Sequence, residues 1–278
     1  LSVSLFVTPL MIRVGLRYGI VQVPGGRRKH RGKVSTLGGV AIFAGFTVAA
    51  VAAQFLPIER FDPKEILRFG GLITGGTIIF IFGLLDDLFE LSPLQMGIGQ
   101  ILAAGAAVGG QIFIETLNNP FTGTQTDPFP YLVTVVVSMF WLGVMMNTVN
   151  FMDGLDGLAA GVAAITGLML FANSAFVLNP AQTSVSLLPL AMTGAALGFL
   201  VYNFFPARVF MGGSAVFLGY LVSTLSIIGG AKMATVLLVM GLPLMDFSWQ
   251  VINRIRKGRN PMYGDRGHIH FRLQDLGL

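Results

Sequence analysis

The chain has 278 residues, of which 54% are hydrophobic and 11% charged; it contains no cysteine and has a formal net charge of +5. Soluble domains carry about 25% charged residues, so this composition excludes an ordinary soluble protein and indicates an all-α polytopic integral membrane protein. The absence of cysteine excludes disulfides and thiolate metal sites. Anionic lipid or a phosphorylated substrate accounts for the positive charge, so we expect no nucleic-acid partner.

Nine apolar segments predict membrane-spanning helices, because a lone spanning strand would leave its backbone unpaired in lipid. We expect these spans near 1–18, 35–56, 69–85, 93–114, 131–152, 157–178, 185–205, 214–229 and 233–252. No room remains for a sizeable soluble domain, so we expect one membrane-embedded domain over 1–278. The chain begins at Leu1 without a charged n-region, which predicts a trimmed start and a genuine first helix.

The positive-inside rule orients these spans. Placing the loop 19–34 in the cytoplasm puts 13 Lys and Arg residues inside and 4 outside. The same parity brings Asp86-Asp87, the run from Asn147 to Asp156, the loop 203–214 and the C-terminal tail to the cytoplasmic side. The sequence therefore predicts one active site at the cytoplasmic face.

The first of these cytoplasmic segments is the basic loop Pro24-Gly-Gly-Arg-Arg-Lys-His30-Arg31-Gly-Lys33. Its cations are dense enough to hold several phosphates, and Gly and Pro keep its backbone irregular. The alternative is a topology anchor that pairs with lipid headgroups. Gly38-Gly39, shortly after it, would let the next helix pack closely or let its backbone approach a ligand.

Asp86 and Asp87 follow the third span directly. Adjacent carboxylates near a bilayer boundary are costly unless they bind a cation, share a proton or reach water, and this favours a functional role. One of them can accept a proton from a substrate phosphate, while the other orients a basic group or a metal ion.

The central motif is Asn147-Thr-Val-Asn150-Phe-Met-Asp153-Gly-Leu-Asp156-Gly-Leu-Ala159. Three residues advance a helix by about 300°, so Asn147, Asn150 and Asp153 fan over about 120° and can converge on one ligand. The two glycines weaken the helix there, and oxygen ligands beside a helix C-terminus suit a hard cation such as Mg²⁺. The alternative is a polar helix end that faces solvent.

The loop Asn203-Phe-Phe-Pro-Ala-Arg208-Val-Phe210-Met-Gly-Gly-Ser214 offers an amide, an aromatic face for stacking and a small-residue turn before a helix. Backbone N–H groups at such a helix start suit an anion. Aromatic residues are also common at membrane interfaces, so an interface anchor is the alternative for Phe210.

The tail Gly264-Asp-Arg-Gly-His268-Ile-His270-Phe-Arg272 holds two of the three histidines of the chain. Alternating His beside Arg fits phosphate binding and metal binding, because imidazole can donate hydrogen bonds, ligate or shuttle protons. A purely structural role on a hydrated tail is the alternative.

Together these motifs resemble the polyprenyl-phosphate N-acetylhexosamine-1-phosphate transferase superfamily over nearly the whole chain and in family order. They read RRKH before a GG helix, GLLDD followed by LSP, NTVNFMDGLDGLA, NFFPARVFMG and DRGHIHFRL. The HIHFRL tail is more similar to the branch that uses a UDP-N-acetylhexosamine than to the branch that uses UDP-MurNAc-pentapeptide.

The resemblance implies transfer of N-acetylhexosamine-1-phosphate, expected to be GlcNAc-1-phosphate, from a UDP-sugar to undecaprenyl phosphate with release of UMP. This reaction would initiate a lipid-linked cell-envelope glycan at the cytoplasmic face of the bacterial inner membrane. The implied cofactor is Mg²⁺, with Mn²⁺ as the alternative ion, and the implied assembly is a homodimer.

The family pattern also implies a role for individual positions. The catalytic positions are Asp86, Asp87, Asp153, His268 and His270. The substrate-binding positions are Asn147, Asp156, Asn203, Phe210, Arg272, Arg31 and Thr36, and the metal-binding positions are Asn150 and Asp153. Within these sets, Asp156, Asn203 and Phe210 would hold the uracil, Asp86 and Asp87 would serve the lipid phosphate, and the tail residues would grip the diphosphate and sugar.

The sequence departs from the family pattern at four places. The family reads MGD, with Asp as a principal Mg²⁺ ligand, whereas the segment Met211-Gly-Gly-Ser214 has no Asp and is one residue short. Met96 replaces the usual Lys after LSP, Gln22 replaces an Asp, and Phe271 replaces a further His. We also expect the family's C-terminal helix to be absent, since the chain ends at Leu278.

Two other functions fit parts of the pattern. A UDP-sugar-binding but catalytically impaired relative would explain the absent metal ligand. A cation-coupled transporter would explain carboxylates at membrane depth, but it predicts polar residues in mid-span, whereas these lie at one end.

Overall fold

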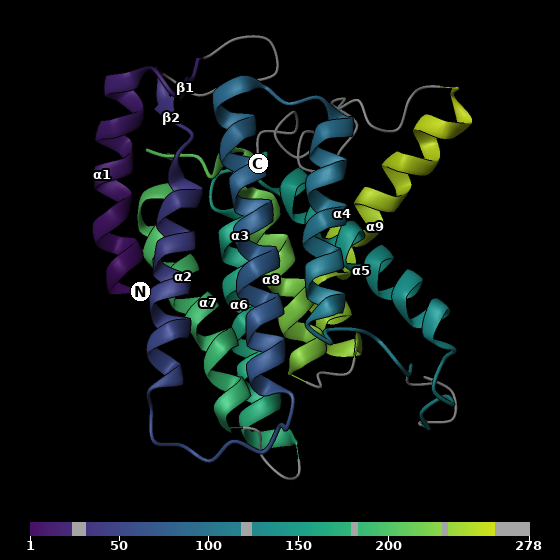
Figure 1. The fold of residues 1–278 in the computed structure, drawn as a ribbon. Coiled ribbons are helices and arrows are strands. Elements are labelled where there is room, and N and C mark those ends of the chain that lie inside the picture. The colour runs from purple at the N-terminus through teal and green to yellow at the C-terminus, as the bar shows by residue number, and fades with distance from the viewer. Residues whose placement is uncertain (24–31, 118–123, 179–182, 230–232, 259–278) are drawn as a thin grey trace.

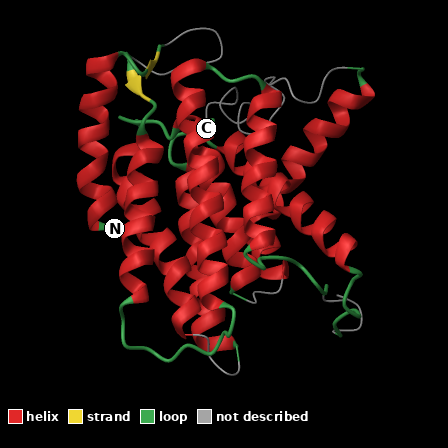
Figure 2. Cartoon of the chain, viewed as in Figure 1, coloured by secondary structure: helices red, strands yellow, loops and turns green. Residues whose placement is uncertain are grey.

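The computed structural model describes residues 1–23, 32–117, 124–178, 183–229 and 233–258, and in these ranges the chain is a bundle of helices with one short hairpin (Figure 1, Figure 2). The α-helices in these ranges are α1 (Ser2–Tyr18), α2 (Gly38–Gln54), α3 (Glu65–Phe89), α4 (Pro93–Gly109), α5 (Tyr131–Met152), α6 (Leu158–Ala172), α7 (Thr183–Asn203), α8 (Ala215–Ile228) and α9 (Met233–Arg256). A π-helical turn (Asn173–Val177) follows α6, a 3₁₀ turn (Gly212–Ser214) precedes α8, and β1 (Val21–Gln22) pairs antiparallel with β2 (Val34–Ser35).

Four of these helices are long and apolar enough to cross a membrane: α3, α5, α6 with its π-helical turn, and α7. The segments Gly38–Gln54 and Gly212–Ile228 are apolar but shorter. Since a spanning helix needs about 20 predominantly apolar residues, these elements make the chain a helical multi-pass membrane protein. The prediction of nine spans stays a prediction.

Helix α8 lies at the centre of the bundle. Nearly all of its side chains are buried, including Phe217 and Tyr220, and it packs against α3 and α5. A helix that is apolar on every side lies in a protein core or in a membrane. Close approach to α3 is possible because Gly75 leaves room for the Tyr220 hydroxyl, which donates to the Gly71 carbonyl at 2.9 Å.

The ends of the bundle differ. Figure 1 shows the β1–β2 hairpin and the connection from α3 to α4 at one end, which we call the hairpin end, and the connection from α2 to α3 at the other. At the hairpin end, residues 35–39 run beside residues 209–211. Phe210 N–H donates to the Ser35 carbonyl at 2.8 Å, and Gly38 N–H donates to the Phe210 carbonyl at 2.9 Å. This junction seats the start of α2 beside the turn that leads into α8.

The third span is longer than the expected 69–85. Helix α3 begins at Glu65, because this buried carboxylate pairs with Arg60 and accepts a hydrogen bond from the Ser184 hydroxyl at 2.9 Å. Partners of this kind allow a charged residue to lie in the first turn of a buried helix. At the other end α3 continues to Phe89, so Asp86 and Asp87 lie within its last turn and do not follow it.

The fourth span is shorter than the expected 93–114. Helix α4 begins with a capping box, in which the Ser92 hydroxyl accepts from the Gln95 N–H and the Gln95 side chain accepts from the Ser92 N–H. It ends at Gly109, and Gln111 has a positive φ of 59°. This left-handed residue turns the chain away from the helix.

Candidate active site

The carboxylates of Asp86 and Asp87 have different surroundings. Asp86 Oδ1 accepts a hydrogen bond from the Leu91 N–H at 2.9 Å and so caps the end of α3. Asp87 Oδ1 accepts from the Gly213 N–H at 2.9 Å, while its Oδ2 is buried without a hydrogen-bond partner. A buried carboxylate oxygen without a partner is costly, and this cost distinguishes Asp87 from Asp86.

The Gly212–Gly213 turn lies directly against these carboxylates. Gly212 has a φ of +71°, and a Cβ there would collide with the Asp87 carboxylate and the Thr36 carbonyl. A Cβ on Gly213 would lie 2.5 Å from the Gly83 carbonyl oxygen and 2.8 Å from Asp86 Oδ2. Neither position has room for a side chain, so an Asp cannot replace either glycine without moving the turn.

Asp153 comes to the same turn from α5, of which it is the C-cap. Burial raises the pKa of the Asp153 carboxyl well above its ordinary value, the charges of Asp87 and Asp156 raise this pKa further, and a hydrogen bond from the Gly212 N–H opposes the shift. The two neighbouring N–H groups of the turn therefore serve two carboxylates, Asp153 and Asp87. Asn150 lies one helical turn earlier on α5 and is half-buried.

Asp156 and Asn203 hold two loops together. Asp156 Oδ2 accepts from the Ala207 N–H at 2.9 Å. The buried Asn203 side chain accepts from the Gly157 N–H at 3.0 Å and donates to the Val209 carbonyl at 2.9 Å. In this arrangement both side chains shape the loop that carries Phe210. Their contact with uracil stays a prediction, as does stacking on the half-buried Phe210 ring.

The structure brings together Asp86, Asp87, Asp153 and Thr36, which the sequence separates widely. Asn147 is instead bound to Gln100 on α4, with Asn147 Nδ2 donating to Gln100 Oε1 at 2.9 Å. No sequence motif identified Gln100. The backbone N–H groups expected to suit an anion at the turn before α8 are those of Gly212 and Gly213, and in the structure they donate to the carboxylates of Asp153 and Asp87. The two consecutive glycines before an apolar helix were the only signal for that turn.

Several predicted site residues lie outside the described residues. These are Arg31 in the basic loop and His268, His270 and Arg272 in the tail. Within the described ranges no group of three His, Asp or Glu side chains is close enough to hold a metal ion, and no Lys or Arg there forms an ion pair with Asp87 or Asp153. The described part of the site is therefore an acidic cluster without a compensating cation.

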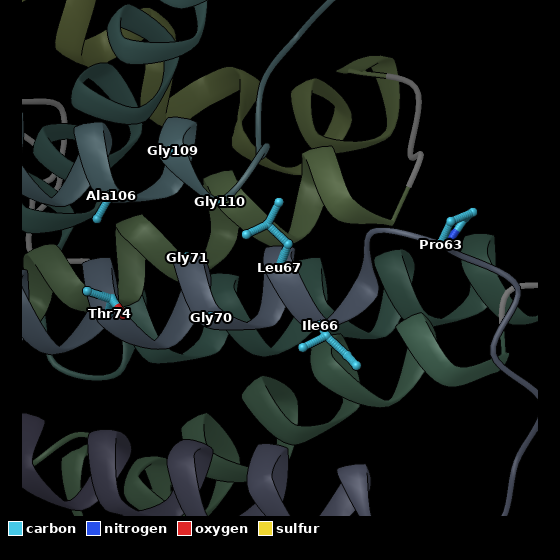
Figure 3. A pocket seen from close by; sticks show the side chains of 9 residues that line it. All are labelled: Pro63, Ile66, Leu67, Gly70, Gly71, Thr74, Ala106, Gly109 and Gly110. Atoms are coloured by element: carbon cyan, nitrogen blue, oxygen red, sulfur yellow. The ribbon is translucent and has the colours of Figure 1, made fainter.

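A separate hollow of about 560 Å³ lies between the first half of α3 and the end of α4, away from the hairpin end (Figure 3). Its lining is apolar except for the Thr74 hydroxyl, and Gly70 and Gly109 leave it open. It carries no ionisable group and none of the predicted site residues. The acids Asp86 and Asp87 lie at the opposite end of α3.

Comparison with known proteins identifies the family of the chain. Residues 69–230 match the family described as glycosyl transferase family 4. The chain is 33% identical to a probable undecaprenyl-phosphate N-acetylglucosaminyl 1-phosphate transferase of Bacillus subtilis, over 99% of the chain and 75% of that protein. It is 30% identical to a decaprenyl-phosphate N-acetylglucosaminephosphotransferase of Mycolicibacterium smegmatis, over 99% of the chain and 73% of that protein.

A third relative is more distant. The undecaprenyl-phosphate alpha-N-acetylglucosaminyl 1-phosphate transferase of Escherichia coli K12 is 27% identical, over 100% of the chain and 76% of that protein. The family match covers α4 to α8 and most of α3, which include Asp86, Asp87 and Asp153. The chain therefore belongs to glycosyl transferase family 4, and its membership of the polyprenyl-phosphate N-acetylhexosamine-1-phosphate transferase superfamily is confirmed.

Proposed function

We propose that the protein transfers GlcNAc-1-phosphate from UDP-GlcNAc to undecaprenyl phosphate, releases UMP and so begins a lipid-linked glycan. The observation that carries this proposal is the meeting of Asp87 from α3 and Asp153 from α5 at the Gly212–Gly213 turn. Relatives named for this transfer to undecaprenyl and decaprenyl phosphate support the choice of sugar and lipid.

The reaction forms a bond between a lipid phosphate oxygen and the sugar-bearing phosphorus, and breaks the bond from that phosphorus to the UMP oxygen. Asp87 is suited to take a proton from the lipid phosphate, because its Oδ2 has no other partner. Asp86 instead holds the end of α3 by accepting the Leu91 N–H. The two neighbouring carboxylates thus take separate roles, one as a base and one in positioning the helix end.

The residues present fit a divalent cation. Mg²⁺ in proteins is often held by one or two carboxylates, with substrate phosphates completing its shell. Asp153, whose raised pKa a neighbouring cation would relieve, supplies one such carboxylate, and Asn150 is placed to assist. When bound, Mg²⁺ or Mn²⁺ would neutralise charge on the diphosphate. The chain's own residues would orient the substrates around it.

The same proposal places the protein in the bacterial cytoplasmic membrane with the hairpin end in the cytoplasm, where UDP-sugars are available. The distribution of Lys and Arg in the sequence supports this orientation. Arg31, His268, His270 and Arg272 would then add cations for the diphosphate, and a homodimer remains the expected assembly.

An impaired relative is the second candidate, and the absence of Asp from residues 211–214 supports it. Under this alternative the site binds the UDP-sugar but does not turn it over. A variant with an Asp inserted after Gly212 and with the substitution Met96→Lys should then regain transfer of the sugar phosphate. A cation-coupled transporter is the third candidate and the least supported. It would need polar residues in mid-span, whereas the polar residues of the site gather at the hairpin end.

The deciding experiment uses the purified protein in detergent with radiolabelled UDP-GlcNAc, undecaprenyl phosphate and Mg²⁺. We expect a lipid-linked sugar and one UMP per product, both lost when the metal is chelated. Binding of UDP-GlcNAc in calorimetry without UMP release, under every metal tried, would establish the impaired relative instead. Neither binding nor release with any UDP-sugar would refute both.

A further inference from the structure

A pair of side-chain amides joins α4 to α5 inside the bundle. Asn147 Nδ2 donates to Gln100 Oε1 at 2.9 Å, and Gln100 Nε2 donates to Asn147 Oδ1 at 3.3 Å. The Asn147 Nδ2 group also donates to the Gly143 carbonyl at 2.8 Å, so both of its N–H groups are in use. Asn147 therefore cannot donate to a substrate unless the pair opens.

Helix α4 stands between the two helices that carry the acids. It packs against both α3 and α5. Gly99, the neighbour of Gln100, lies so close to the Phe82 ring of α3 that a Cβ would collide with it. Phe82 precedes Asp86 by one helical turn. Helix α4 therefore packs on α3 one turn before Asp86. The residue next to this contact, Gln100, is the one that binds Asn147 of α5.

The position of Asn147 on α5 links the Gln100–Asn147 contact to the orientation of Asn150 and Asp153. Asn147, Asn150 and Asp153 lie within about 120° of one face of α5. Any rotation of α5 about its axis therefore moves all three together. Holding Asn147 against Gln100 fixes that rotation, and with it the direction from which Asp153 reaches Asp87 and the Gly212–Gly213 turn.

We infer that the Gln100–Asn147 pair is a positioning device of the active site, in which Gln100 holds α5 so that Asn150 and Asp153 face Asp87. Gln100 is then a positioning residue. Asn147 acts through it and does not touch the nucleotide, in contrast to the role that the family resemblance implies. This inference rests on the proposed function, because it assigns the pair to the same site.

The test uses the length of the two side chains. Gln100→Asn leaves the pair too short and Asn147→Gln leaves it too long, whereas the double exchange restores the total length with the same two amides. We expect each single variant to lower kcat about 10- to 100-fold with KM for UDP-GlcNAc little changed. The double exchange should bring kcat back to within about threefold of the wild type.

Thr148→Val is the matched control. Thr148 is buried on the same helix, and its hydroxyl donates only to the Val144 carbonyl of α5 at 2.8 Å. This variant should leave kcat unchanged. A rise in KM for UDP-GlcNAc in Asn147→Gln that the double exchange does not cure would make Asn147 a substrate ligand and overturn the inference. Single variants that lower only the thermal midpoint, with kcat intact, would overturn it as well.

A second measurement separates this inference from the proposed function. Wild-type protein that makes no lipid-linked sugar would refute the function, and the pair would then be tested by Mn²⁺ binding, followed by electron paramagnetic resonance. We expect the single variants to weaken Mn²⁺ binding about tenfold and the double exchange to restore it. Equal Mn²⁺ affinity in all variants, in a protein that binds Mn²⁺, would contradict a positioning role.

Discussion

At the scale of single residues, the two neighbouring acids of α3 are not equivalent. Asp87 has a buried oxygen without a partner, whereas Asp86 caps its own helix. We expect Asp87→Asn to lower kcat/KM about 100-fold or more, because a general base contributes about 10²–10⁴ in rate. Asp86→Asn should lose less, since an amide oxygen can still accept the Leu91 N–H.

Steady-state UMP release by both variants, with thermal midpoints to verify folding, checks this assignment. The opposite ranking, with Asp86→Asn inactive and Asp87→Asn active, would exchange the two roles.

The raised pKa of Asp153 predicts how cation binding depends on pH. Because burial and nearby charges raise this pKa, part of the Asp153 population is protonated at a pH where an ordinary Asp is fully ionised. A cation must displace that proton, so Mn²⁺ affinity should rise with increasing pH and fall as the pH drops through the raised pKa. Titrating Mn²⁺ at several pH values tests this sign. Asp153→Asn should flatten the profile, and a profile unchanged by that substitution would assign the proton to another group.

The Gly212–Gly213 turn gives a third prediction at this scale. Gly213→Ala should lower turnover about 10- to 100-fold, because its Cβ would lie 2.5 Å from the Gly83 carbonyl and push the Gly213 N–H away from Asp87. Gly105→Ala on α4 is the control, since a Cβ there meets nothing within 4 Å. The measurement is UMP release by both variants under identical conditions. Full activity of Gly213→Ala would show that the turn plays no part in holding Asp87.

At the scale of elements, charged side chains close the end of the bundle away from the hairpin. Arg60 pairs with Glu65 and donates to the Gln54 carbonyl at 2.9 Å, and Ser184 of α7 donates to Glu65. These contacts join α2, α3 and α7. We expect Glu65→Gln to cost about 1–3 kcal/mol, because hydrogen bonds to a buried charged group are replaced by weaker neutral ones.

Thermal unfolding in detergent measures this cost, with Glu59→Gln, exposed in the same connection, as the unaffected control. Turnover below the unfolding temperature should stay at the wild-type level. A Glu65→Gln variant that keeps its thermal midpoint but loses turnover would contradict a purely structural role for Glu65.

The sequence was informative where a pattern is local. Helix α5 spans Tyr131–Met152, the range expected from its apolar run, and the fan of Asn147, Asn150 and Asp153 follows from helix geometry. The sequence was uninformative where a contact depends on the fold. Gln100 lies in an apolar segment without a motif, and its partner is 47 residues away.

The partners of backbone groups could not be predicted either. The small-residue turn indicated N–H groups that suit an anion, but the sequence does not show that the Gly213 N–H binds Asp87, 126 residues away. The same limit explains the wrong boundaries of the third span, since the partners of Glu65 lie in other elements.

At the scale of the whole molecule, the orientation in the membrane can be tested cleanly because the chain has no cysteine. Glu59→Cys and Arg208→Cys place single thiols at exposed positions on the two ends. In intact bacteria a membrane-impermeant maleimide should label position 59 at once and position 208 only after permeabilisation. Labelling of position 208 in intact cells would put the acids on the outer side and refute the proposed use of cytoplasmic UDP-sugars.

The junction between residues 35–39 and 209–211 has a consequence for biogenesis. Gly38 N–H pairs with the Phe210 carbonyl and Gly39 N–H with the Met211 carbonyl, so the start of α2 lacks these partners until the ribosome has synthesised most of the chain. Contacts between such distant segments form late, because a long loop must close before they contribute. This junction can therefore form only after residue 211 has been synthesised, and a chain stalled before that point would insert its first helices without completing the candidate site.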